Sequence, residues 1–287
     1  GLDFLARTQK LEGNWPDETA GTEAAITGLA VVSLLAHGDD PNFGPYNQAV
    51  HRGIDYLIKR QDTNTGYIGP TMYNHGFATL ALAESYGAVD DPRLGPALKK
   101  AVGLILAAQQ RSSYKAWRYS PESPDADTTV SGAQMVALLA ARNAGIPVPQ
   151  QSIQDGLRFY YSCQTGDGGF GYMNPTGPNA TRTAIGCLVM ALAKEKNSPA
   201  FLAAVEFLKN APPDTQYPPY FRYYFSQAAF QGAPAFWENW NRDNIKALRA
   251  SQTSDGGWDG MFGQTFCTAG SLLSLALNYR YLPIYER

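Results

Sequence analysis

A turn that recurs along the chain constrains its fold more than any other feature. Residues 163–171 read CQTGDGGFG, and residues 252–258 repeat the motif as QTSDGGW. Looser copies keep a glutamine and a following aromatic residue: Gln9 and Trp15, Gln61 and Tyr67, and Gln109 and Trp117. Bulky or apolar residues four and five positions before each glutamine indicate a helix that ends there. We expect the glutamine to bond the backbone of the adjoining helix end, and repeats at roughly 40–55 residues indicate a repeat architecture.

Apolar stretches rich in alanine and leucine follow these turns and predict second helices. When they are aligned, one register holds a glycine five times: Gly28, Gly76, Gly132, Gly186 and Gly270. Glycine inside a helix costs about 1 kcal/mol relative to alanine, so we expect neighbouring helices to approach closely there. One more pair comprises a helix ending near Leu208 and a helix beginning near Tyr223. With no stretch of strand-like alternation, the sequence predicts an all-α chain of six helical hairpins.

The hairpins are expected to close into a ring. The second helices are apolar nearly all round, which suits an inner layer covered by the first helices. The first and last hairpins lack the polar capping face that an open solenoid requires. We therefore predict one domain over residues 1–287, an (α/α)6 toroid whose inner-helix N-termini open on one rim.

Bulk composition excludes several classes of function. The 287 residues are 44% hydrophobic and carry a formal net charge of −2, so no basic surface is available for nucleic acid. No apolar run approaches the length of an integral membrane segment. We expect a soluble protein, and export after removal of a signal peptide preceding Gly1 stays open. The three cysteines have no paired spacing, which favours buried thiols over disulfides.

The glutamine–aromatic turns resemble the QW repeats of the terpenoid cyclase and protein prenyltransferase superfamily, over nearly the whole chain. In that superfamily the toroid centre holds an isoprenoid chain. The resemblance thus implies an apolar central cavity and an apolar, isoprenoid-like small-molecule partner. Prenyltransferases bind zinc through Asp-x-Cys and a later His, but the corresponding residues 180–182 and 264–266 read ATR and QTF. We therefore expect no metal site and no cofactor.

A pair of carboxylates precedes the third predicted inner helix. Cyclases that begin by protonation carry Asp-x-Asp-Asp at such a position and use the middle Asp as the acid. Here the motif reads Asp125-Ala126-Asp127-Thr128. The resemblance implies a protonation-initiated cyclase or isomerase with Asp127 as general acid and Asp125 beside it, although Thr128 replaces the third carboxylate. Helix capping by the same residues is the competing interpretation.

Further candidates lie near the predicted inner-helix starts and the turns. We expect substrate binding by Glu23, His75, Trp117, Arg182, Tyr223 and Tyr224. Aromatic faces would stabilise a carbocation, and the arginine would bind a carboxylate or diphosphate. For the aromatic residues the competing interpretation is core packing, and for the arginine it is pairing with a neighbouring acid.

Two other functions stay open. The first is a non-enzymatic toroid that binds a ligand or a protein partner. It gains support because squalene-type cyclases have two toroid-like domains, whereas one is predicted here. The second is a carbohydrate-active (α/α)6 enzyme, which requires opposed carboxylates, with Glu23 and Asp127 as the candidate pair.

Overall fold

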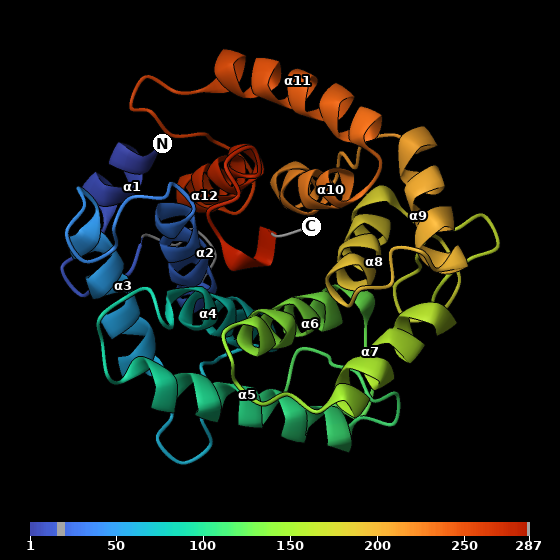
Figure 1. Cartoon of the computed structure of the whole chain (residues 1–287), viewed down its shortest axis with the longest axis horizontal. Coiled ribbons are helices and arrows are strands. Elements are labelled where there is room, and N and C mark those ends of the chain that lie inside the picture. Colours follow the sequence, from blue (N-terminus) through green and yellow to red (C-terminus); the bar gives the residue numbers. More distant parts are fainter. Residues whose placement is uncertain (16–20, 286–287) are drawn as a thin grey trace.

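The computed structural model describes residues 1–15 and 21–285, which form twelve α-helices and one short 3₁₀ helix. The helices alternate between an outer and an inner ring (Figure 1). The inner helices are α2 (Glu23–Leu35), α4 (Met72–Ser85), α6 (Thr128–Asn143), α8 (Ala180–Leu192), α10 (Pro218–Gln231) and α12 (Gly263–Ala276). The outer helices are α1 (Leu2–Thr8), α3 (Asn47–Arg60), α5 (Leu94–Arg111), α7 (Gln150–Ser162), α9 (Pro199–Asn210) and α11 (Pro234–Ser251). This arrangement confirms the predicted all-α (α/α)6 toroid.

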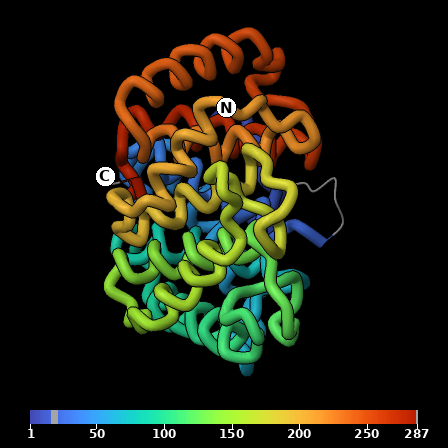
Figure 2. The backbone as a smooth tube through the Cα atoms, turned by 90° about the vertical axis from the view of Figure 1, so that its right-hand side faces the viewer, coloured from blue at the N-terminus to red at the C-terminus, as the bar shows by residue number. Residues whose placement is uncertain are grey.

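The ring is closed by contacts between its inner helices. Each inner helix packs against the inner helices of the hairpins before and after it, and α12 packs against α2. Turned by 90°, the yellow and orange later hairpins lie in front of the blue ones across the ring (Figure 2). An inner helix touches two neighbours and an outer helix, which explains why its residues are apolar nearly all round. None of the helices in the described chain is long and apolar enough to cross a membrane.

In four of the five turns, the glutamine ties one hairpin to the next. Gln164 Nε2 donates to the Gly168 carbonyl of its own turn (3.1 Å) and to the Ala200 carbonyl in the first turn of α9 (2.8 Å). The same pair of bonds is made by the three preceding glutamines, Gln9, Gln61 and Gln109. The predicted bond to an adjoining helix end is therefore confirmed in these four turns.

Three turns close on a tryptophan that anchors the preceding outer helix. The indole N–H of Trp15 donates to Leu5 O at 2.7 Å, and that of Trp258 donates to Leu248 O at 2.9 Å. Trp117 makes the equivalent bond in the third turn. Turn side chains thus fix the ends of outer helices, which explains why the motif recurs: indoles bond α1, α5 and α11, and glutamine amides bond α3, α5, α7 and α9.

The aligned glycines permit close helix contacts at three of the five positions. A Cβ atom on Gly28 would lie 2.5 Å from Phe77 O of α4, and one on Gly132 would lie 2.1 Å from the Ile185 side chain of α8. Gly76 is equally tight against α6. Gly186 instead packs against the ring of Phe170 in its own turn. At Gly270 the prediction is wrong, because the nearest atom, Pro219 O, would lie 3.7 Å away.

Two further features differ from the sequence-based expectation or extend it. Helix α10 begins at Pro218, five residues before the predicted start at Tyr223, because proline is tolerated in a first helical turn that needs no N–H partner. Beyond α12 the chain returns to the middle of the ring as the 3₁₀ helix η1 (Pro283–Tyr285), which packs against α6 (Figure 1). Leu282 is buried together with Ile284 and Tyr285 of this segment.

Candidate functional site

Asp127 is the N-cap residue of α6, and its side chain is fully buried. Its Oδ1 accepts hydrogen bonds from the backbone N–H groups of Thr129 and Val130, both at 2.9 Å, and from Thr129 Oγ1 at 2.6 Å. Its Oδ2 is also buried and has no hydrogen-bond partner among the described residues. The capping interpretation is therefore confirmed, but one carboxylate oxygen is left that the cap does not use.

The surroundings of Asp127 act on its proton in two directions. Burial raises the pKa of the carboxyl because desolvation penalises the charged form. Hydrogen bonds from Thr129 and Val130 and the positive charge of Arg118 lower the pKa, with a smaller effect than burial. Because Oδ1 is occupied by three donors, the proton of the neutral acid belongs on Oδ2. The donors are already positioned to stabilise the carboxylate once that proton leaves.

Asp125 forms the charged part of the same site. Its Oδ2 pairs with a guanidinium nitrogen of Arg118 at 2.9 Å. The guanidinium carbon lies 5.8 Å from the ring centre of Tyr119 and 5.7 Å from that of Tyr172, within cation–π range. The two tyrosine hydroxyls are 3.3 Å apart. Sequence reasoning missed Arg118 and Tyr172, since no motif marks either residue and they meet only where two loops fold together.

Thr128 occupies the position of the third carboxylate in the cyclase motif and has a structural role. Its Oγ1 donates to Gly171 O at 2.9 Å, and its backbone N–H donates to Tyr172 O at 2.9 Å. The residue is fully buried. It therefore fastens the segment after the fourth turn to the start of α6, and it gives Asp127 no acidic neighbour.

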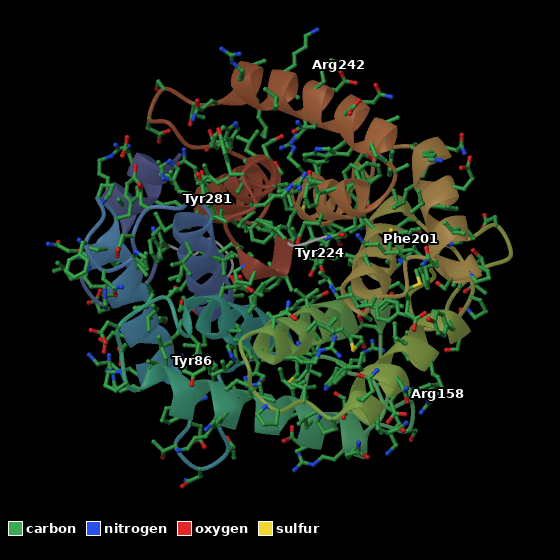
Figure 3. All side chains as sticks on the ribbon, in the orientation of Figure 1. Tyr86, Arg158, Phe201, Tyr224, Arg242 and Tyr281 are labelled. Atoms are coloured by element: carbon green, nitrogen blue, oxygen red, sulfur yellow. The ribbon has the colours of Figure 1, made fainter. Side chains whose placement is uncertain are left out.

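Aromatic rings extend from Asp127 toward the middle of the ring. The Tyr73 hydroxyl donates to Thr129 Oγ1 at 2.6 Å, which in turn donates to Asp127. The Tyr73 ring centre lies 6.4 Å from that of Tyr220. The series continues through Tyr224 and Tyr223, with centre distances of 4.9 and 4.7 Å, and Tyr224 lies near the middle of the ring (Figure 3). Buried and partly buried tyrosines therefore occupy the space between α4 and α10.

His75, on inner helix α4, and Trp117, in the third turn, both face outer helix α5. His75 Nδ1 accepts from the Ile68 N–H at 3.1 Å, and Nε2 donates to Ala101 O of α5 at 2.9 Å. Burial lowers the pKa of His75 to about 4, so the ring is neutral at physiological pH. The indole N–H of Trp117 donates to Ile105 O at 2.8 Å. The polar groups of both side chains are thus bound to backbone, and packing accounts for their presence.

Glu23 and Arg182 lie at the N-terminal ends of α2 and α8, which open on the same rim as α6. Glu23 is the first residue of its helix and is half-buried. The Arg182 guanidinium donates to the carbonyls of Gly177 and Phe170 in the preceding turn. The structure thus brings Asp125, Asp127 and the tyrosine series together, with Glu23 and Arg182 at other helix starts. Within the described residues, no three His, Cys, Asp or Glu side chains are placed to hold a metal ion.

Comparisons with known proteins agree on the fold. The sequence matches no family model and no curated protein. Among solved structures, the type II terpene cyclase MstE from Scytonema has a TM-score of 0.66 at 18% identity, with 98% of this chain and 97% of that chain covered. Its R337A variant in complex with the substrate geranylgeranyl dihydroxybenzoate has a TM-score of 0.68 at 18% identity, covering 96% and 94%.

A second kind of enzyme has the same toroid. The α-1,6-mannanase GH76A of Salegentibacter sp. HEL1_6, in an inactive variant bound to α-1,6-mannotriose, has a TM-score of 0.71 at 10% identity. The alignment covers 96% of this chain and 97% of the mannanase chain. At these identities the likeness concerns the fold, which this chain shares both with a terpene cyclase and with a glycoside hydrolase.

Proposed function

We propose that the rim around the start of α6 binds an apolar, unsaturated small molecule of isoprenoid type and that Asp127 protonates it. The observation that carries this proposal is the buried, unpartnered Oδ2 of Asp127 beside an Oδ1 that accepts three hydrogen bonds. A helix cap requires an oxygen that accepts hydrogen bonds, as Oδ1 does, but it does not require a second, buried oxygen without a partner. The fold shared with a terpene cyclase that binds a geranylgeranyl substrate adds support, while no residue role is taken from it.

The proposed reaction is internally balanced and requires no cofactor. The proton on Oδ2 passes to one carbon of a double bond, whose electron pair forms the new C–H bond, and the adjacent carbon becomes a cation. Asp127 is left as a carboxylate, stabilised by the donors on Oδ1 and by the charge of Arg118. In cyclisation, a second double bond of the same molecule attacks this cation, and the positive charge moves to one of the carbons of that second bond. In cyclisation and isomerisation alike, the last cation loses a neighbouring proton to water, and a proton from water returns to Asp127.

The tyrosine series would bind the substrate and stabilise the cation through the ring faces. Tyr73 lies nearest to the acid, through Thr129, and Tyr223 and Tyr224 form the deeper part of the series. Because these rings fill the space between α4 and α10, an isoprenoid chain enters only if they move apart. Glu23 and Arg182 would contact the polar end of such a molecule at the rim.

Product analysis tests the proposal. The wild-type protein, Asp127→Asn and the matched control Asp243→Asn are incubated with squalene or geranylgeraniol, and products are identified by mass spectrometry. Asp243 lies on outer helix α11 with its side chain 72% exposed, so its substitution should leave turnover unchanged. We expect a cyclised or isomerised product from wild type and control and none from Asp127→Asn. A product that persists in Asp127→Asn would exclude Asp127 as the acid.

Two further assays separate the alternatives. Binding of an isoprenoid by all three proteins, measured by titration calorimetry, without any product would favour the non-enzymatic toroid. Incubation with α-1,6-mannotriose covers the carbohydrate-active alternative. Its hydrolysis, lost in both Glu23→Gln and Asp127→Asn, would replace the isoprenoid proposal.

A further inference from the structure

A cavity of about 470 Å³ lies at the end of the ring opposite to Asp127, where the inner helices finish. Its walls come from the C-terminal ends of α2, α4 and α6, the loops that follow α2 and α4, and the chain after α12. Its polar and aromatic lining residues are Asp39, Glu84, Tyr86, Asn143 and Tyr281, and the others are alanine, glycine, leucine and proline. No lysine or arginine of the described chain lines it. This volume suits a small molecule.

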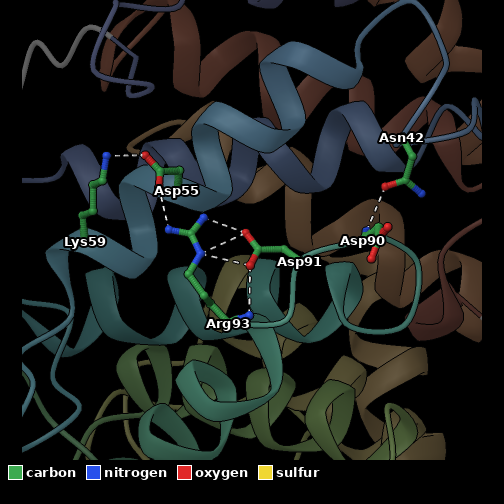
Figure 4. A network of polar contacts seen from close by, with 6 residues as sticks. All are labelled: Asn42, Asp55, Lys59, Asp90, Asp91 and Arg93. Atoms are coloured by element: carbon green, nitrogen blue, oxygen red, sulfur yellow. Dashed lines mark hydrogen bonds and ion pairs between the residues drawn. The ribbon is translucent and has the colours of Figure 1, made fainter.

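Two of its walls are joined by specific hydrogen bonds. Asn42, in the loop after α2, donates to Ala88 O at 3.0 Å and accepts from the Asp90 N–H at 2.8 Å, which fastens it to the loop after α4 (Figure 4). Close by, Arg93 pairs with Asp91 at 2.7 Å and with Asp55 at 2.8 Å, joining the start of α5 to α3 (Figure 4). The cavity is therefore bounded by loops held in place by their own contacts.

Glu84 is a buried acid in the wall of this cavity. Only 5% of the residue is exposed, and its Oε2 has no hydrogen-bond partner within residues 1–15 and 21–285. The Ile284 N–H bonds the carboxyl, but burial still raises the pKa of Glu84 to about 8. An acid buried with a free oxygen is costly to a fold, and such groups concentrate at functional sites.

We propose that this cavity binds an organic cation, a primary amine or a quaternary ammonium, with Glu84 as its counter-ion. The two carboxyls in the lining, with no basic side chain among its described residues, disfavour an anionic ligand. The rings of Tyr86 and Tyr281 supply faces for cation–π contact. Asp39, whose carboxylate is 2.8 Å from His37 Nδ1, adds negative charge on the side of the loop after α2. The proposal is independent of the reaction assigned to Asp127.

Cation binding should release a proton. A neutral Glu84 loses its proton to solvent as the ion pair forms, because a nearby positive charge favours the carboxylate. Within the part of the chain that the structure describes, the ionisable groups around Glu84 are Asp39 with its partner His37 from the loop after α2, and four tyrosines: Tyr86, Tyr223, Tyr281 and Tyr285. Tyrosines are uncharged at neutral pH, so the release reports chiefly on Glu84.

Titration calorimetry tests the proposal with choline and its uncharged isostere 3,3-dimethylbutan-1-ol. We expect choline to bind at least about tenfold more tightly than the alcohol, because only choline can pair with a carboxylate. At pH 7 the heat of choline binding should vary with the ionisation enthalpy of the buffer, as proton release requires. Equal affinity for the two compounds, or no binding of choline at millimolar concentration, would overturn the proposal.

Two matched substitutions locate the site. Glu84→Gln keeps the shape and the oxygen that accepts from Ile284 N–H, and it should weaken choline binding at least about tenfold and abolish the buffer dependence. Glu206→Gln, on outer helix α9 with a 66% exposed side chain, should change neither. Unchanged choline affinity in Glu84→Gln would contradict the assignment. If that variant does not fold, the wild-type comparison of choline with the alcohol decides.

Discussion

Two carboxyls, Asp127 and Glu84, are buried at opposite ends of the inner helices. Asp127 receives three hydrogen bonds on one oxygen, whereas the Glu84 carboxyl accepts one from the Ile284 N–H among the described residues. Hydrogen-bond donors stabilise a carboxylate and so offset the cost of burying its charge. Glu84 has fewer donors than Asp127, so less of this cost is offset at Glu84. Folding stability should therefore respond to pH most clearly through Glu84.

Glu84→Gln should remove a pH dependence of stability. The folded pKa of about 8 lies above the value of 4.5 for an unperturbed glutamate, so the folded state retains a proton that the unfolded chain loses. Stability from this group is complete below pH 4.5 and is lost as pH rises through about 8, at up to about 1.4 kcal/mol per pH unit. In urea unfolding at pH 5, 6.5 and 8, the free energy of unfolding of Glu84→Gln should rise relative to that of wild type at each step. A constant difference would contradict the raised pKa.

Asp127 can be separated into its capping and acidic roles. Asparagine keeps an oxygen that accepts from the Thr129 and Val130 N–H groups, whereas alanine leaves both without it. We expect Asp127→Ala to lower the free energy of unfolding by about 1–2 kcal/mol and Asp127→Asn by less. Denaturant unfolding of the two variants measures this. If Asp127→Asn proves as destabilising as Asp127→Ala, a loss of product in Asp127→Asn would no longer distinguish loss of the acid from loss of the cap.

At the level of single elements, the third turn departs from the others. Four turns place a glycine at positive φ before the aromatic residue, at Gly13, Gly66, Gly168 and Gly256, and the third turn has Lys115 at φ 52°. A side chain in this left-handed region costs roughly 1–2 kcal/mol, whereas glycine adopts it freely.

Lys115→Gly should therefore stabilise the protein by about 0.5–1 kcal/mol. The Lys115 Nζ contact with Gln110 O at 2.8 Å is exposed and contributes little. Lys115→Ala is the control, because it removes that contact but keeps the Cβ atom that causes the strain. Thermal and urea unfolding compare the three proteins. A glycine variant no more stable than the alanine variant would show that the backbone is unstrained.

The elements differ in how far the sequence predicts them. The hairpins and turns are predictable because each depends on a local sequence motif and the motif repeats along the chain. The start of α10 is not, since Pro218 and Pro219 suit a loop and a first helical turn equally well. Asp127 stands out through its motif, whereas Arg118 acquires its role only where two loops meet. Glu84 belongs to no motif. The sequence marks it only as an acid within an apolar run whose other residues are typical of a core.

At the scale of the whole molecule, the ring is filled from two directions. The tyrosine series occupies the part nearer to Asp127, and the chain after α12 occupies the other end, where Leu282, Ile284 and Tyr285 are buried. Tyr285 lies close enough to Tyr223 that ionisation of one hydroxyl would disfavour ionisation of the other. The toroid thus uses its own C-terminal segment as part of its core, and this segment also forms one wall of the cavity beside Glu84.

Ile284→Ala tests whether this segment stabilises the ring. Ile284 is 4% exposed, and truncating a buried isoleucine removes apolar contacts and leaves a void, so the free energy of unfolding should fall by about 2–4 kcal/mol. Tyr279→Ala is the control, because Tyr279 precedes the same segment but is 65% exposed and should change stability by less than about 0.5 kcal/mol. Urea unfolding compares both variants with wild type. Equally small changes in the free energy of unfolding for Ile284→Ala and Tyr279→Ala would mean that the segment contributes little to the core and that the inner helices stabilise the toroid without it.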